Sequence, residues 1–138
     1  MTAAAKDTNL EPTVFVVDDD PAMRSSLRWL LESEGLAVET YETAEDFLDV
    51  CDPRRSGCLV LDVRMPGIGG VGLQRELNAR GVPWPVIVIT GYADAATESR
   101  VREAGAHAFL KKPFDDALLI DVVAHAIAAD RATRTAPN

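Results

Sequence analysis

Short apolar runs alternate with longer amphipathic stretches along this chain. Four of the runs are rich in β-branched residues and too short for helices, so they predict buried strands over residues 13–18, 57–62, 85–90 and 107–111. A fifth segment, residues 37–41, alternates apolar and polar side chains and predicts a strand that is less buried. The pattern therefore predicts five strands.

Helical patterns occupy the intervals between these strands. Residues 21–34 carry apolar side chains on one face, and Gly35 follows as a residue typical of helix ends. Thr43 is suited to cap the next helix, because Asp46 completes a pattern similar to a capping box. Further helices are predicted over residues 70–80, 94–104 and 115–130. The 94–104 segment is the least amphipathic of them.

These elements follow one another as a strand and a helix, repeated five times. Apolar strands joined by helical crossovers predict a parallel sheet that helices cover on both faces. We therefore expect an α/β fold, a doubly wound five-stranded parallel sheet, in one domain over residues 13–130. The ends, residues 1–12 and 131–138, are expected to be flexible, and the second has the character of a linker.

Composition and charge exclude several classes of function. The 138 residues are 47% hydrophobic and 26% charged, as in ordinary globular proteins, and the formal net charge is −8. This charge argues against direct binding to nucleic acid or to an anionic membrane surface. No apolar run approaches the roughly 20 residues of a membrane span, and the first residues lack the apolar region of a secretory signal. We expect a cytoplasmic protein.

The cysteines and tryptophans indicate no binding site. Cys51 and Cys58 have neither a second cysteine pair nor a nearby histidine, so we expect buried free thiols rather than a zinc site. Trp29 and Trp84 are interpreted as packing residues. Candidate chemistry must come from other side chains.

Polar and charged side chains follow four of the five predicted strands. Asp18 and Asp19 end the first strand, Asp62 the third, Thr90 the fourth, and Lys112 follows the fifth. Ligands of open α/β sheets bind beyond the carboxyl ends of the strands, where these side chains converge. Carboxylate oxygens suit a hard cation such as Mg²⁺, and a hydroxyl and a lysine suit a phosphoryl group. An aspartate between them could accept that group as an acyl phosphate.

Four motifs carry a resemblance to a known family. They are the segments "VVDDDP", "LVLDVRMPG", "VIVITG" and "FLKKPF". Their order and spacing resemble the receiver domain of bacterial two-component response regulators, and "LDVRMPG" and "ITG" are most similar to its FixJ-like branch. The resemblance implies the flavodoxin-like (βα)5 receiver fold. It also implies that a sensor histidine kinase phosphorylates the domain, whose change of conformation then controls an output.

The resemblance also implies a role for each residue at the predicted edge. Asp62 would be the phosphoacceptor. Asp19 would bind Mg²⁺ directly, Asp18 would help partly through water, and the backbone carbonyl of Arg64 would complete the protein ligands. Thr90 would hydrogen-bond the phosphoryl group and Lys112 would pair with it. Asp20 would belong to the start of a helix, where aspartate is a good N-cap.

Further residues are expected to act in switching and in signal lifetime. Phe109 occupies the position of the family's switch aromatic, which turns inward when the threonine, here Thr90, moves. The Lys112–Pro113 peptide bond should be cis. Arg64 and Tyr92 occupy the positions that flank the approach of hydrolytic water, and neither can orient that water as a general base. Slow self-dephosphorylation is expected.

The expected partners and output also follow from the resemblance. In the FixJ-like branch a receiver usually precedes a helix-turn-helix DNA-binding domain, and this sequence contains no such effector. The output would be transcription through an effector domain absent here, or a partner protein. Phosphorylation could also create a homodimer surface. The domain would not be an enzyme in the turnover sense.

Two other functions compete with this interpretation. A phosphohydrolase with an aspartate nucleophile would use a D-x-D-x-T/V motif starting at Asp18, but Ala22 occupies the place of the threonine or valine. A flavodoxin-type carrier would need hydroxyls and glycines in its first loop. The segment "GIGGVG", residues 67–72, fits a dinucleotide-binding pattern, but "VRMP" separates it from the strand, so we expect a flexible loop.

Overall fold

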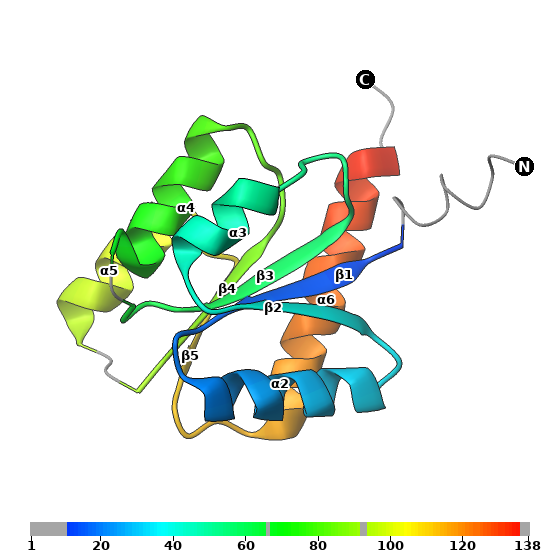
Figure 1. The fold of residues 1–138 in the computed structure, drawn as a ribbon, viewed down its shortest axis with the longest axis horizontal. Helices are drawn as coiled ribbons and strands as arrows, with labels where there is room; N and C mark the ends of the chain where they lie inside the picture. Colours follow the sequence, from blue (N-terminus) through cyan, green and yellow to red (C-terminus); the bar gives the residue numbers. More distant parts are fainter. Residues whose placement is uncertain (1–10, 66, 92–93, 136–138) are drawn as a thin grey trace, which may run out of the picture.

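The structure is a computed structural model that describes residues 11–65, 67–91 and 94–135. Strands and helices alternate along the described residues, as Figure 1 shows. The strands are β1 (Thr13–Val17), β2 (Ala37–Tyr41), β3 (Gly57–Asp62), β4 (Val86–Thr90) and β5 (Ala108–Lys111). The helices are α2 (Pro21–Ser33), α3 (Ala44–Val50), α4 (Gly69–Ala79), α5 (Ala95–Glu103) and α6 (Asp116–Thr135).

All strand pairs in the sheet are parallel, in the order β2-β1-β3-β4-β5. Helices α2 and α6 cover one face, and α3, α4 and α5 cover the other (Figure 1). The predicted doubly wound α/β fold is confirmed. Because every strand runs in the same direction, the carboxyl ends of all five strands lie along one edge of the sheet.

Two apolar cores form because successive side chains of a strand point to opposite faces. On β1, Val14 and Val16 face α2 and α6, whereas Phe15 faces α3 and α4. The ring of Phe15 stacks on Trp84 at 4.5 Å and lies 5.7 Å from Phe47. Burying each such side chain contributes roughly 1.5–3 kcal/mol. The uniformly apolar strands thus match burial on both faces.

Side chains cap helices at their first turns, among them α2, α3 and α5. Asp20 accepts a hydrogen bond from the backbone N–H of Ala22 at the start of α2, as the sequence predicts. The hydroxyl of Thr43 accepts from the N–H of Asp46 at the start of α3. Asp94 caps α5 in the same way. The predicted Thr43 cap is therefore present.

Helix α6 differs from its predicted end. The sequence places residues 131–138 in a flexible tail, but α6 continues to Thr135. Arg134 explains the extension, because its guanidinium donates to Asp130 Oδ2 at 2.8 Å and to the backbone carbonyls of residues 53–55. Residues 1–10 and 136–138 lie outside the described part of the chain, so the prediction of flexible ends is not addressed there.

The segment of residues 67–72 is also different from its prediction as a loop. Helix α4 begins at Gly69, so most of the segment is helical. Gly70 lies so close to β3 that a Cβ atom there would be 2.6 Å from the Cα of Val63 and 2.9 Å from the carbonyl oxygen of Asp62. A glycine is required at this contact because any side chain would push α4 away from the end of β3.

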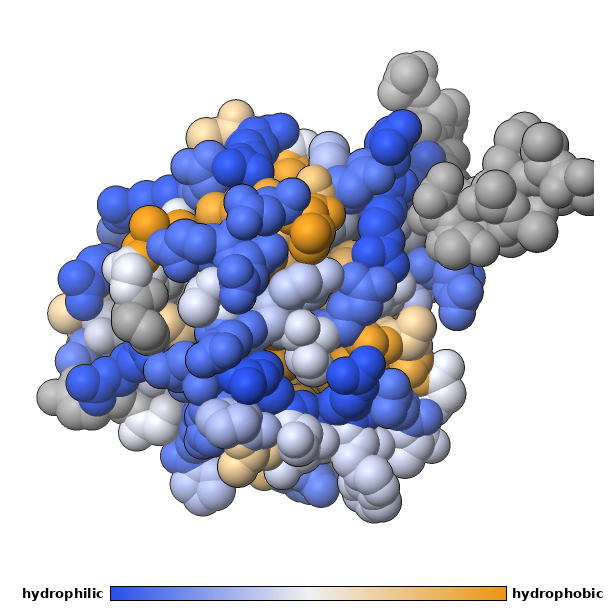
Figure 2. All heavy atoms as spheres, viewed as in Figure 1, coloured by the Kyte–Doolittle hydropathy of each residue, from blue (hydrophilic) through white to orange (hydrophobic). Residues whose placement is uncertain are grey.

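The surface agrees in part with the expectations from composition. The face in Figure 2 is mainly hydrophilic, with smaller hydrophobic areas. No helix among the described residues has the length and apolar character needed to cross a membrane. Cys51 and Cys58 are free, but only Cys58 is buried as expected, whereas Cys51 is partly exposed; burial raises the pKa of Cys58 to about 12. Trp84 packs in the core, but Trp29 is 73% exposed, so its interpretation as a packing residue is wrong.

Candidate functional site

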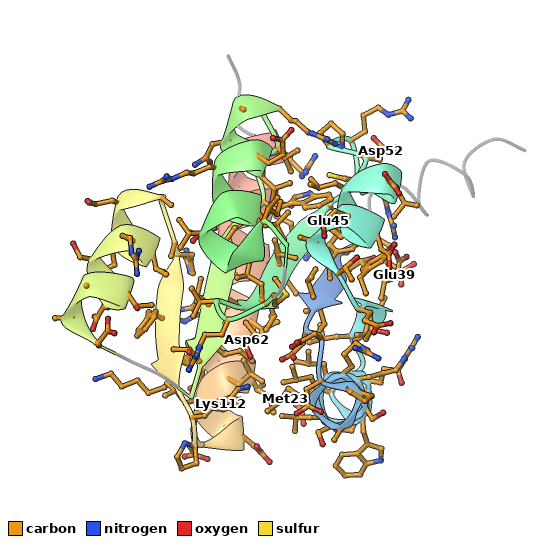
Figure 3. The ribbon with its side chains drawn as sticks, turned by 60° about the vertical axis from the view of Figure 1, so that its left-hand side comes forward. Met23, Glu39, Glu45, Asp52, Asp62 and Lys112 are labelled. Atoms are coloured by element: carbon orange, nitrogen blue, oxygen red, sulfur yellow. The ribbon has the colours of Figure 1, made fainter. Side chains whose placement is uncertain are left out.

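The predicted site residues gather at the carboxyl edge of the sheet. Asp62 ends β3, Asp18 follows β1, and Lys112 follows β5. Figure 3 labels Asp62 and Lys112, which come from strands on either side of β4. Thr90, the last residue of β4, is fully buried between them in the strand order. The topology alone brings residues up to 94 positions apart to one place.

Three carboxylates form a cluster at this edge. Asp18, Asp19 and Asp62 each offer one oxygen, and these oxygens lie within 4.8 Å of one another. Asp18 and Asp62 are buried, whereas Asp19 is exposed. Like charges at this separation repel, so the group is unfavourable unless a proton, a cation or water compensates it.

Backbone N–H groups hold one oxygen of each buried carboxylate. The N–H of Asp20 donates to Asp18 Oδ1 at 2.9 Å, and the N–H of Arg64 donates to Asp62 Oδ1 at 2.9 Å. Both bonds span two residues, as in turns that follow a strand. They fix the side chains through one oxygen each; the second oxygen of Asp62 accepts from Lys112, and that of Asp18 has no hydrogen-bond partner among the described residues.

The second oxygen of Asp18 carries the clearest sign of a cation site. Asp18 Oδ2 is buried and has no hydrogen-bond partner among the described residues. Burial raises the pKa of Asp18, the N–H of Asp20 opposes that shift, and the charge of Asp62 adds to it. A buried carboxylate oxygen without a partner is costly. A hard cation with oxygen ligands would supply the missing partner, so the residues fit Mg²⁺.

Lys112 provides a cation on the other side of Asp62. Its Nζ lies 3.2 Å from Asp62 Oδ2, and the two side chains are 23% and 12% exposed. The backbone N–H of Lys112 also donates to the carbonyl of Thr90 at 2.8 Å. Asp62 therefore lies between the acidic cluster and an ammonium group. A phosphoryl group on Asp62 would have positive charge available at Lys112.

Two other predicted residues come from β5 and from the segment after β3. Phe109 lies in β5, partly buried against the core under α3, α4 and α5. The side chain of Arg64 is exposed beyond β3. The Lys112–Pro113 peptide bond is cis, as expected. Tyr92 lies outside the described residues, so its predicted place beside the site is not addressed.

Asp20 is not part of the cluster. Its carboxylate caps α2 and is exposed. A phosphohydrolase of the D-x-D type would need this second aspartate in the site. The geometry therefore gives that alternative no support.

An apolar groove adjoins the site, and sequence reasoning did not identify it. The groove has a volume of about 840 Å³ and shares Lys112 with the site. Met23, labelled in Figure 3, lines it together with the exposed Trp29 and with Phe114. The unusual exposure of Trp29 could not be read from the sequence, because its helical position alone does not say what covers it.

Gly70 is a second feature that sequence reasoning missed. Its close approach to Val63 and to the carbonyl of Asp62 positions the first turn of α4 against the end of β3. The signal was present in the glycine-rich segment after "VRMP", which was interpreted as a loop. A glycine at the start of a helix beside a functional strand end can serve packing.

Comparison with known proteins identifies the family. The family model described as "Response regulator receiver domain" matches residues 14–124. The chain is 53% identical over 110 residues to the transcriptional regulatory protein FixJ of Azorhizobium caulinodans, covering 80% of this chain and 52% of that protein. It is 44% identical over 127 residues to the transcriptional regulatory protein TdiR of Thauera aromatica, covering 92% and 56%. The chain thus spans about half the length of these relatives.

Solved structures agree with the sequence relatives. The response regulator StyR superposes with a TM-score of 0.85 at 44% identity, covering 90% of this chain and 63% of that chain. The crystal structure of FixJ-N gives a TM-score of 0.80 at 39% identity, covering 86% and 94%. Receiver domains of this family work with sensor histidine kinases. The chain belongs to the response regulator receiver domain family, in its FixJ-like branch.

Proposed function

We propose that this receiver domain accepts a phosphoryl group from a sensor histidine kinase on Asp62. The contact between Asp62 Oδ2 and Lys112 Nζ, 3.2 Å long, beside a cluster of carboxylates, carries the proposal. In the transfer, a carboxylate oxygen of Asp62 bonds to phosphorus. The bond from phosphorus to the histidine nitrogen breaks, and its electron pair remains on the imidazole.

The residues around Asp62 divide into two groups in this proposal. Asp18, Asp19 and Asp62, with the backbone carbonyl of Arg64, would hold Mg²⁺, which would offset the charge of the carboxylates and the phosphoryl oxygens. Lys112 and the hydroxyl of Thr90 bind the phosphoryl oxygens from the other side. Removing charge repulsion between the attacking carboxylate and the phosphoryl group is the main contribution of both groups.

Phosphorylation then changes conformation rather than starting a catalytic cycle. Thr90 moves toward the phosphoryl group, and Phe109 turns inward behind it. The altered surface around β5 and its neighbouring helices forms a homodimer or binds a partner. Because the FixJ and TdiR relatives are named transcriptional regulators and the match covers only 52% and 56% of their length, the output is transcription through an effector domain outside this sequence. The protein acts in the cytoplasm.

Incubation with acetyl phosphate and Mg²⁺ tests the proposal. Intact-mass spectrometry should find one acyl phosphate on the wild type and none on Asp62→Asn. Asp20→Asn is a matched control, since Asp20 caps α2 nearby without facing the cluster, and it should be phosphorylated normally. Stoichiometric acyl phosphate on Asp62→Asn would refute the assignment, and continuous phosphate release without an adduct would point to a phosphohydrolase.

A further inference from the structure

Helix α4 begins without a side-chain cap of its own. Its N-cap residue is Ile68, whose side chain makes no capping hydrogen bond, and its first turn contains no acidic residue. The first N–H groups of a helix lack partners within the helix, and they carry a partial positive charge. Helices α2, α3 and α5 each have a side-chain oxygen at this place. Any side-chain acceptor for the start of α4 has to come from another element.

Glu45 of α3 supplies such an acceptor. Its Oε2 accepts a hydrogen bond from the backbone N–H of Ile68, with a distance of 3.4 Å between nitrogen and oxygen. A bond of this length is weak by itself. Glu45 comes from the first turn of α3 and is exposed, and Figure 3 labels it together with Asp62. The carboxylate of Glu45 thus links α3 to the start of α4.

A second contact shows that this carboxylate packs against the chain just before α4. Gly67 has a φ of +78°, a conformation that favours glycine. A Cβ atom at Gly67 would lie 2.7 Å from Oε2 and 3.2 Å from Oε1 of Glu45. Both carboxylate oxygens therefore lie where another residue would place its side chain. The backbone conformation and the contact with Glu45 both require glycine at this position.

The chain that Glu45 contacts follows the proposed phosphoacceptor directly. We call residues 63–65 and 67–69 the β3–α4 segment. At its beginning, the N–H of Arg64 donates to Asp62 Oδ1 at 2.9 Å. The backbone carbonyl of Arg64, which is a proposed Mg²⁺ ligand, belongs to the same segment. Contacts that fix this segment therefore fix a part of the site.

Three attachments hold the β3–α4 segment in different ways. The side chain of Met65 is buried in the core under α3, α4 and α5. The N–H of Gly70 donates to the carbonyl of Val63 at 3.2 Å, which closes the segment at α4. Glu45 adds a polar contact from α3. An exposed carboxylate with one long hydrogen bond adds little to stability, so its effect is on the position of the backbone that it contacts.

We propose that Glu45 is a positioning residue of the phosphoacceptor site. By holding Ile68 and Gly67, its carboxylate keeps the β3–α4 segment in the conformation in which the carbonyl of Arg64 can bind Mg²⁺. The inference rests on the proposed function for the metal, and it adds a residue of α3 outside the cluster of carboxylates. Because Glu45 touches neither the phosphoryl group nor the attacking oxygen, it should change the affinity for Mg²⁺ rather than the transfer itself.

Amide exchange in the metal-free protein tests the attachment. In Glu45→Ala the amide proton of Ile68 should exchange with solvent about fivefold faster than in the wild type, as measured by nuclear magnetic resonance. Asp46→Ala is the matched control, because Asp46 is the other acidic residue in the first turn of α3. It removes the same charge and the same interaction with the start of α3, and it should leave Ile68 unchanged. Equal effects of the two variants, or an unchanged Ile68 in Glu45→Ala, would overturn the proposal.

The affinity for Mg²⁺ tests the consequence for the site. Calorimetric titration should give a Kd about fivefold higher in Glu45→Ala, which is less than the roughly 10–100-fold loss expected for a direct partner of a metal ligand. Glu45→Gln keeps an oxygen that can accept from Ile68, so it should recover most of the affinity. Asp46→Ala should bind Mg²⁺ nearly as the wild type does. A Glu45→Gln variant as weak as Glu45→Ala would attribute the effect to charge and contradict positioning.

The dependence of phosphorylation on Mg²⁺ separates positioning from a general structural role. With acetyl phosphate as the donor, Glu45→Ala should react more slowly than the wild type at low Mg²⁺ and equally fast at saturating Mg²⁺. A rate that stays lower at saturating Mg²⁺ would contradict the proposal. If the wild type neither binds Mg²⁺ nor gains a phosphoryl group, the proposed function fails and this inference fails with it. If the wild type does both and Glu45→Ala binds Mg²⁺ as tightly, this inference alone fails.

Gly67→Ala changes the same contact from the other side. Its Cβ would displace the carboxylate of Glu45, so it should raise the Kd for Mg²⁺ in the wild-type background and raise it less in Glu45→Ala. The strain of a side chain at positive φ is common to both backgrounds and cancels in this comparison. An equal increase in the two backgrounds would show that the two residues act independently, and the proposal would be wrong.

Discussion

The two edges of the sheet each bury an aspartate with one carboxylate oxygen that has no hydrogen-bond partner among the described residues, but the charges around the two side chains differ. At the amino edge, Asp130 Oδ2 accepts hydrogen bonds from the hydroxyl of Ser56, the N–H of Gly57 and the guanidinium of Arg134. At the carboxyl edge, Asp18 Oδ2 has no partner among the described residues. Strand β3 joins the edges, since it runs from Gly57 to Asp62.

This difference separates charged groups that stabilise the fold from charged groups that are suited to bind a ligand. The amino edge supplies its own cations, with Arg134 paired to Asp130 and Arg55 paired to Glu39. The carboxyl edge gathers three carboxylates within 4.8 Å. Asp130 Oδ1 has no hydrogen-bond partner among the described residues either, but Asp130 has the guanidinium of Arg134 beside it. Asp18 instead lies beside two further carboxylates, and Lys112 pairs with Asp62. This excess of negative charge is consistent with a cation bound from outside.

The largest effect should come from the amino edge. Asp130→Ala removes the acceptor of three hydrogen bonds and the carboxylate that pairs with Arg134, so the free energy of unfolding should fall by about 3 kcal/mol. Urea unfolding measures this loss. Asp52→Ala, which breaks an exposed ion pair with Arg54, is the control and should leave the midpoint unchanged. If Asp130→Ala changed the unfolding midpoint as little as Asp52→Ala, the proposed difference between the two edges would be contradicted.

At the carboxyl edge, removing a carboxylate should have the opposite result. Asp19→Ala relieves repulsion within the cluster, so in metal-free buffer the thermal midpoint should stay the same or rise. Mg²⁺ should stabilise the wild type by about 2.7 kcal/mol at a hundred times its dissociation constant, and should not stabilise the variant, which also loses phosphorylation. Thermal unfolding in a Mg²⁺ series measures both. A large loss of stability without metal would instead show that Asp19 is structural.

The residues that meet at the carboxyl edge could be predicted from sequence, because they follow from the positions of the strands. The apolar runs located β1, β3, β4 and β5, and parallel strands bring their ends together regardless of separation along the chain. Asp18, Asp62 and Lys112 follow those runs directly. Their assembly therefore needed only the strand positions, and not the packing of any helix.

The contacts of the amino edge and the burial of Gln74 could not be predicted in the same way. Arg134 reaches carbonyls about 80 positions earlier in the chain, and no local pattern marks such a contact. Gln74 is a polar residue buried inside a helix interface, against the usual tendency of its type. Both depend on how a helix packs across the sheet. That packing decides where a helix ends and which polar residues it buries.

The smallest expected effect is a pH dependence at the amino edge. The two terminal nitrogens of the Arg55 guanidinium, Nη1 and Nη2, donate to Glu39 at 3.0 and 2.8 Å, and this pairing holds the pKa of Glu39 below its usual 4.5, against the opposing effect of burial. A carboxyl group with a lowered pKa in the folded state stabilises the protein above its unfolded pKa, and this stability is lost as the pH falls through the folded pKa. The Glu39 side chain is 38% exposed, so solvent screening limits the effect to below about 1 kcal/mol.

Urea unfolding of wild type and Glu39→Gln across the acidic range measures this effect. The wild type should be the more stable protein near neutral pH, and its advantage should shrink as the pH falls below about 4.5. At the carboxyl edge burial raises the pKa of Asp18, so ionisation there disfavours the folded state. In metal-free buffer, the stability of the wild type relative to Asp18→Asn should therefore rise as the pH falls. The stability of the wild type relative to Glu39→Gln and its stability relative to Asp18→Asn should thus change with pH in opposite directions. If they changed in the same direction, the contrast between the two edges would not hold.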